Sequence, residues 1–165
     1  MYLVFFSIFY VYILFTLSYT QFPIYIQTPE GLRLSYSEIF QNNIIYIPQL
    51  SELISPAGLA NIVMTIPFGF GSGFLIRVNL KRIILFGILF SFSLELLQFT
   101  NMVITQISQR TVNVNDLINN TIGAVIGYFL FVLFVKCFKS VIDKYNIQLN
   151  RMMQYINDLT NSKIN

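Results

Sequence analysis

The sequence predicts an all-α, polytopic membrane protein: a four-helix transmembrane bundle with a cytoplasmic, amphipathic C-terminal helix. Of the 165 residues, 55% are hydrophobic and only 10% are charged, and the mean hydropathy is +0.66. Four apolar runs each approach the roughly 20 residues that span a hydrocarbon core. This composition excludes an ordinary soluble domain and a disordered tail. The net charge of +3 is small, and the Lys and Arg residues flank the apolar runs, so we expect no nucleic-acid partner.

The apolar runs predict membrane-spanning helices at about residues 2–19, 58–76, 83–99 and 117–135. Together they define a transmembrane domain over residues 1–135, followed by a helical tail over residues 136–165. The first run lacks a basic n-region and a small-residue cleavage site. We therefore expect a helix there and not a cleaved signal peptide.

The basic residues predict the orientation of these spans. Arg77, Lys81 and Arg82 separate the second and third runs, and Lys136, Lys139 and Lys144 follow the fourth. Because short cytoplasmic loops carry the excess of Lys and Arg, both termini are expected in the cytoplasm. The abundance of Ile, Asn, Phe and Tyr with no Trp indicates an AT-rich genome. We therefore expect a multi-pass protein of a bacterial plasma membrane.

The tail carries an apolar stripe at alternating spacings of four and three residues, which is typical of a heptad repeat. Three interpretations stay open: a helix that lies on the membrane surface, a helix that self-associates, and a partly ordered tail. The stripe consists of Phe138, Ile142, Tyr145, Leu149, Met152, Ile156 and Leu159.

Glu95 lies inside the third apolar run, where a carboxylate is costly unless it has a function. Ser91, Glu95 and Gln98 recur at i, i+4 and i+7 and so share one helical face. At about 1.5 Å per residue, Glu95 lies about 18 Å beyond Ile83, in the outer half of a core of about 30 Å.

Other polar residues fall at a similar depth on the predicted outer side. Asn61 starts the second run, Asp116, Asn119 and Asn120 open the fourth, and Arg110 precedes them in the outer loop. A guanidinium binds carboxylates or phosphates through two hydrogen bonds. The sequence therefore predicts one outward-opening ligand-binding pocket, formed by Asn61, Glu95, Gln98, Arg110, Asp116 and Asn119.

These residues also have structural interpretations. Arg110 can pair with Asp116 to cap the fourth helix, where a negative side chain favours the helix dipole. The amides can bond between helices for about 1 kcal/mol or less each. Gly123 and Gly127 form a G-x-x-x-G step, which indicates close helix packing and also offers a surface for homo-oligomers, together with the tail.

The sequence limits the available chemistry. The absence of histidine excludes His-based catalysis and His-ligated metals, and we expect no metal site and no cofactor. A single cysteine, Cys137, allows no internal disulfide. Glu95 and Asp116 are the candidate catalytic residues, but no nucleophile–base pair accompanies them, so catalysis is left open with a preference against it.

Three blocks together resemble the VanZ-like family: Asn61–Phe70 with Pro67 and Gly69, Ser91–Gln98, and Arg110 with Asn115–Gly127. The similarity extends over about residues 2–135 and leaves out the tail. The resemblance implies a membrane protein of the bacterial cell envelope, in a family whose name-giving members are associated with low-level resistance to the glycopeptide antibiotic teicoplanin.

Three functions remain as expectations. The first is binding or shielding of a membrane lipid or lipid-linked cell-wall precursor in the outer leaflet. The second is an intramembrane enzyme that acts on a lipid-linked substrate, with Glu95 or Asp116 as general base and Arg110 beside the phosphate. The third is a small membrane scaffold without catalysis.

Overall fold

A computed structural model describes residues 1–22, 24, 33–107 and 111–163, and confirms the predicted all-α class. Four of its helices are long and apolar enough to cross a membrane: α1 (Tyr2–Gln21), α4 (Pro56–Leu75), α5 (Leu80–Thr105) and α6 (Val114–Tyr145). The other described elements are short: α2 (Tyr36–Asn42), β1 (Ile44–Ile45), α3 (Leu50–Leu53), β2 (Val112–Asn113) and α7 (Arg151–Lys163).

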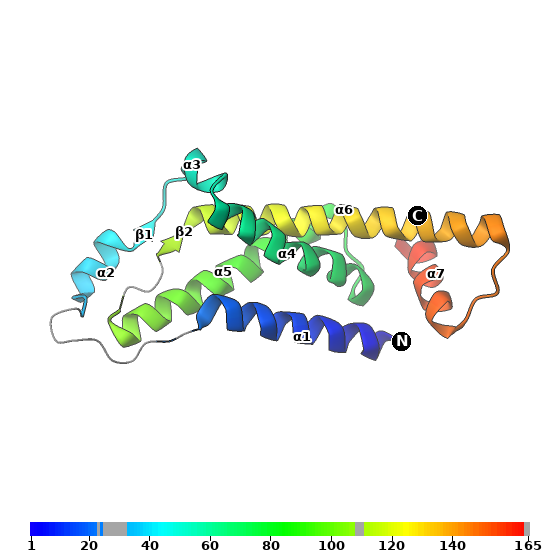
Figure 1. The fold of residues 1–165 in the computed structure, drawn as a ribbon, viewed down its shortest axis with the longest axis horizontal. Coiled ribbons are helices and arrows are strands. Elements are labelled where there is room, and N and C mark those ends of the chain that lie inside the picture. Colours follow the sequence, from blue (N-terminus) through cyan, green and yellow to red (C-terminus); the bar gives the residue numbers. More distant parts are fainter. Residues whose placement is uncertain (23, 25–32, 108–110, 164–165) are drawn as a thin grey trace.

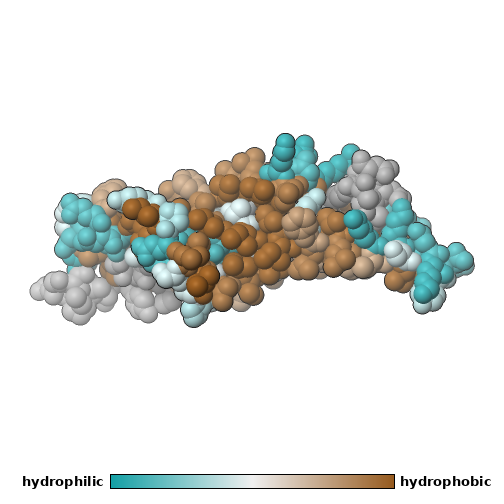
Figure 2. Space-filling view, turned by 90° about the horizontal axis from the view of Figure 1, so that it is seen from above, coloured by the Kyte–Doolittle hydropathy of each residue, from teal (hydrophilic) through white to brown (hydrophobic). Residues whose placement is uncertain are grey.

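The long helices lie roughly side by side and give the molecule two different ends (Figure 1). One end carries α2, α3, β1 and β2, and we call it the strand end. The other carries the N-terminus, the turn between α4 and α5, and the connection from α6 to α7, and we call it the basic end. Between them the surface is mostly hydrophobic, while hydrophilic residues gather at both ends (Figure 2). This distribution matches a bundle surrounded by hydrocarbon.

The helices α5 and α6 begin before their apolar runs because asparagines cap their first turns. Asn79 Oδ1 accepts a hydrogen bond from the Arg82 N–H at 2.9 Å, and Asn113 Oδ1 accepts one from the Asn115 N–H at 3.0 Å. Both side chains satisfy donors that have no partner within the helix. The polar first turns therefore continue each helix beyond the hydrophobic stretch.

The backbones of α4 and α6 are in direct contact through glycines. A Cβ added at Gly69 would overlap the carbonyl of Ala124, and one at Gly127 would overlap the carbonyl of Ile66. Gly123 faces the carbonyl of Ile62 in the same way. The G-x-x-x-G step thus serves packing within the chain, because only residues without a side chain permit this approach.

The tail does not form the single striped helix that its heptad spacing suggested. The first part of the stripe extends α6 to Tyr145, and Asn146 then adopts the left-handed conformation with φ 46°. Asn150 starts α7, since its Oδ1 accepts from the N–H groups of Met152 and Met153 at 3.0 and 2.9 Å. The two asparagines favour a helix end and a helix start.

As a result α7 folds back onto the bundle. Ile156 is 6% exposed and packs in one cluster with Phe74, Phe131 and Val135 of α4 and α6. The hydroxyl of Tyr155 donates a hydrogen bond to the Phe74 carbonyl at 2.6 Å. That carbonyl lies in the last turn of α4, where it has no partner within the helix. Apolar packing and the hydrogen bond of Tyr155 therefore attach α7 to the basic end.

Candidate binding site

A short strand pair brings the start of α6 beside the segment that precedes α3. Ile44 pairs with Val112 and Ile45 with Asn113 in parallel register, and the Val112 N–H donates to the Asn43 carbonyl at 2.9 Å. Asn113 is therefore fixed at the strand end before the first turn of α6 begins.

Asn113 uses its backbone and both side-chain atoms to connect three parts of the chain. Its Oδ1 caps α6, its Nδ2 donates to Glu52 Oε2 at 2.8 Å, and its N–H donates to Glu95 Oε2 at 2.9 Å. Hydrogen bonds to an ionised carboxylate are stronger than bonds between neutral groups. Asn113 thus joins a carboxylate of α3 to a carboxylate of α5.

Asn115 adds a second amide to the same network. It is 1% exposed, and its Nδ2 donates to Glu52 Oε2 and to Asn113 Oδ1, both at 2.8 Å. Its Oδ1 accepts from the Gln49 N–H at 2.9 Å. One Glu52 oxygen therefore accepts from two asparagine side chains, which compensates for withdrawing the carboxylate from water.

Glu95 is 6% exposed and Ser91, one turn before it, is fully buried. Ser91 Oγ accepts from Asn120 Nδ2 at 2.9 Å, and its own proton is directed at the Asp116 carbonyl at 3.5 Å. The Oδ1 of Asn120 is buried without a hydrogen-bond partner among the described residues. Since buried polar atoms are normally paired, this oxygen can accept from an ordered water.

The structure assembles some of the predicted site residues and separates others. Asn119 is 1% exposed and donates to the Leu53 carbonyl at 3.2 Å, so it lies beside the network. Gln98 is half-buried and its Nε2 faces the Thr20 carbonyl of α1 at 3.5 Å. Ser91 and Gln98 share one face of α5, but Ser91 contacts α6 whereas Gln98 contacts α1.

Asn61 and Asp116 lie near the starts of α4 and α6. The Asn61 carbonyl accepts from Thr65 Oγ1 at 2.9 Å, and no described hydrogen bond connects its side chain to the network. Asp116 lies half-buried in the first turn of α6, where its charge favours the helix dipole, but Asn113 is the cap. Arg110 lies outside the described residues.

Glu52, Asn113 and Asn115 are the network residues that sequence reasoning missed. An asparagine two residues ahead of another polar residue and an apolar run is an N-cap signal, so Asn113 had a local indication. Glu52 had none, because its partners lie 61 and 63 residues away.

A pocket of about 370 Å³ lies against this network, between α5, α6 and the two strands. Phe92 and Leu96 line it and are 55% and 51% exposed, so the pocket opens on the surface that faces lipid. Its walls are apolar apart from Glu95, Asn113 and the hydroxyl of Tyr46. The lining comprises Ile44, Ile45, Tyr46, Phe92, Glu95, Leu96, Phe99, Val112, Asn113, Val114 and Leu117.

This site combines a recessed carboxylate with hydrocarbon walls, and hydrogen-bond acceptors of this kind orient the polar part of an amphiphilic ligand. Among the described residues, no group of three His, Cys, Asp or Glu residues could hold a metal ion. The carboxylate and the apolar walls around it suit recognition of a ligand by hydrogen bonding.

The four long apolar helices define the class of the chain, a helical membrane protein. The profile of the VanZ/LLP1 family matches residues 2–135, which include all of α1 to α5 and most of α6. The chain therefore belongs to the VanZ/LLP1 family, and the resemblance seen in its sequence blocks is confirmed. Neither the search of curated proteins nor the search of solved structures finds a significant match.

Proposed function

We propose that this VanZ-family protein binds the head of a membrane lipid or lipid-linked cell-wall precursor at its strand end, and thereby reduces susceptibility to teicoplanin. The observation that carries the proposal is the pocket beside α5 and α6, in which the Glu95 carboxylate lies among apolar walls. An amphiphile that enters from the bilayer can place hydrocarbon on Phe92 and Leu96 and its polar group beside Glu95.

The chemistry of the described residues favours a head with hydrogen-bond donors. The Glu95 carboxylate accepts from the Asn113 N–H, and a carboxylate has about four lone-pair sites for acceptance. Hydroxyl, amide or ammonium groups of a precursor match this acceptor. Arg110, three residues before Asn113 in the sequence, is the candidate cation for an anionic part of the same head.

The proposed location follows from the charges of the two ends. The basic end carries Arg77 in the turn between α4 and α5, Lys81 and Arg82 in the first turn of α5, and Lys136 and Lys139 on α6. Because short cytoplasmic loops carry an excess of Lys and Arg, these charges support the proposal that this end and both termini lie in the cytoplasm, in a multi-pass protein of the bacterial plasma membrane. The strand end then faces outward, at the level of the outer leaflet.

The decisive experiment measures teicoplanin susceptibility of a sensitive Gram-positive host that expresses wild type, Glu95→Gln or Glu38→Gln at equal membrane levels. Glu38 is a matched control because it is exposed and bonds to Ser35 outside the pocket. We expect protection from wild type and Glu38→Gln and loss of protection from Glu95→Gln. Full protection by Glu95→Gln at equal levels would remove the pocket from the mechanism.

Direct binding gives the second readout. Losing a hydrogen bond to a charged group costs about 1.5–3 kcal/mol, so Glu95→Gln should weaken binding of a purified lipid-linked precursor about tenfold or more. Native mass spectrometry of the detergent-solubilised protein measures this change against Glu38→Gln. Altered lipid or precursor profiles in a deletion strain point to catalysis by Glu95 or Asp116, in place of binding alone.

A further inference from the structure

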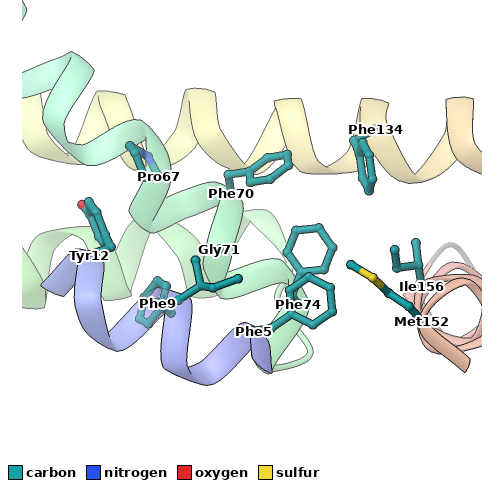
Figure 3. Close-up of a pocket in the computed structure, with 11 residues that line it drawn as sticks. Phe5, Phe9, Tyr12, Pro67, Phe70, Gly71, Phe74, Phe134, Met152 and Ile156 are labelled. Atoms are coloured by element: carbon teal, nitrogen blue, oxygen red, sulfur yellow. The ribbon is translucent and has the colours of Figure 1, made fainter. Parts of the chain in front are cut away.

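A second pocket, also of about 370 Å³, lies near the basic end between α1, α4, α6 and α7. Figure 3 shows its lining side chains converging from these four helices, with Phe5 and Phe9 on α1, Phe134 on α6, and Met152 on α7. It belongs to a different part of the molecule from the Glu95 pocket and shares none of its lining residues.

The pocket offers few hydrogen-bond partners for water. Among its lining residues only Tyr12 has a polar side-chain atom that hydrogen-bonds strongly, and its hydroxyl already donates to the Met64 carbonyl at 2.9 Å. A buried water needs two to four polar partners, and apolar cavities stay dry. The natural occupant is therefore hydrocarbon.

The pocket is also accessible from the bilayer. Ile8, Phe134 and Met152 are 63%, 38% and 46% exposed, so the rim belongs to the lipid-facing surface. At the far side α7 closes the recess, because Ile156 is buried against α4 and α6 and Tyr155 bonds to Phe74. A chain can therefore enter laterally, beside the exposed side chain of Met152 on α7.

The charges around this end select the type of lipid. Arg151 is exposed and precedes the lining residue Met152, and Lys136 and Lys139 lie on the neighbouring stretch of α6. Basic residues near a membrane surface attract anionic lipids by about 1 kcal/mol each. We propose that this pocket holds one acyl chain of an anionic phospholipid whose headgroup lies among the basic residues of the same end.

Photo-crosslinking tests the proposal on the full-length purified protein in phosphatidylcholine vesicles. The probe is phosphatidylglycerol with a diazirine in the middle of one acyl chain, compared with phosphatidylcholine that carries the same chain. We expect the phosphatidylglycerol probe to label peptides of α1, α4 and α7 that line the pocket, more strongly than the phosphatidylcholine probe does. Equal labelling by the two probes, or uniform labelling of the exposed apolar surface, overturns the proposal.

Substitutions that fill the pocket provide the specific control. Ile8→Trp places an indole at the rim, whereas Val11→Trp makes the same change on the same helix outside the lining, and both positions are 63% exposed. Labelling should fall about tenfold, the effect of 1.4 kcal/mol, in Ile8→Trp only.

Met152→Trp and Gln154→Trp repeat this test on α7, where Met152 lines the pocket and Gln154 is exposed outside it. Unchanged labelling in folded Ile8→Trp and Met152→Trp proteins contradicts the proposal.

Discussion

The same helices α4, α5 and α6 run through both ends of the molecule, but different forces hold the two ends together. At the strand end, Asn113 and Asn115 bond to the carboxylates of Glu52 and Glu95 with defined donors and acceptors. At the basic end, Phe74 and neighbouring apolar side chains pack in one cluster, supported by the hydrogen bond from Tyr155 to the Phe74 carbonyl.

The two ends therefore differ in how strictly they constrain the shape of a bound group. A hydrogen-bonded network depends on the position of each atom, and a partly satisfied one is costly. Apolar packing tolerates changes of shape if volume is conserved. The strand end therefore has the properties that the proposed recognition of a particular head requires, and the basic end has those that the proposed binding of a hydrocarbon chain requires.

The largest expected loss of stability comes from the close contact between the α4 and α6 backbones, the two helices that connect both ends. Gly69→Ala places a Cβ against the carbonyl of Ala124 and forces the α4 and α6 backbones apart. We expect a loss of about 3 kcal/mol, at the upper range for overpacking. The apparent midpoint of thermal unfolding in detergent, followed by size-exclusion chromatography, measures it.

Gly71→Ala is the matched control, because its Cβ would meet only the ring of Phe9, which can rotate. A loss of about 1 kcal/mol or less is expected there. If both alanine variants unfold at the same temperature, the close backbone contact is not what holds the two ends in one bundle.

A smaller effect distinguishes the ends directly, because each has an asparagine cap. Asn113→Ala removes the cap of α6 and one of the two described amide donors to Glu52, for a combined loss of about 2 kcal/mol. Asn79→Ala removes only the cap of α5, worth about 1 kcal/mol. Thermal unfolding of both variants measures how much more stability is lost in Asn113→Ala than in Asn79→Ala, and this difference is the contribution of the network. Equal losses would mean that the strand end is no more demanding than the basic end.

The smallest effect concerns the attachment of α7. Tyr155→Phe removes the hydrogen bond to the Phe74 carbonyl and should cost about 1 kcal/mol. Faster hydrogen exchange confined to α7 is the expected result, because the apolar cluster remains. Tyr145→Phe is the control, since Tyr145 is 65% exposed. Faster exchange throughout α4 and α6 would show that α7 supports the whole bundle.

The burial of Tyr155 predicts that the attachment of α7 depends on pH. Burial, with a smaller effect from Tyr2, raises the pKa of the Tyr155 hydroxyl above its ordinary value. Because the pKa is raised in the folded state, the stabilisation is complete below the unfolded-state value near 10 and is lost as the pH rises through the folded-state value. Exchange of α7 should therefore accelerate at strongly alkaline pH in the wild type, and Tyr155→Phe should not show this step.

Residue type predicted the helices better than it predicted their contacts. Long apolar runs identify α1, α4, α5 and α6, and the cost of a carboxylate in hydrocarbon identified Glu95 as a buried residue. Glu52 escaped notice because its partners are distant in sequence. The spacing of the apolar residues in the tail suggested one helix, but Asn146 and Asn150 divide it into two. The stripe stays regular across this break because both of its halves contact the same bundle.

The pairing of Glu52 with Asn113 also has a consequence for biogenesis. Asn113 is synthesised 61 residues after Glu52, a delay of roughly 3–12 seconds at about 5–20 residues per second. During that interval α4 and α5 are synthesised, and the Glu52 carboxylate has neither Asn113 nor Asn115 as a partner. The contact between Glu52 and Asn113 therefore cannot form before α4 and α5 have been synthesised, and a chain stalled before residue 113 lacks both asparagine partners of Glu52.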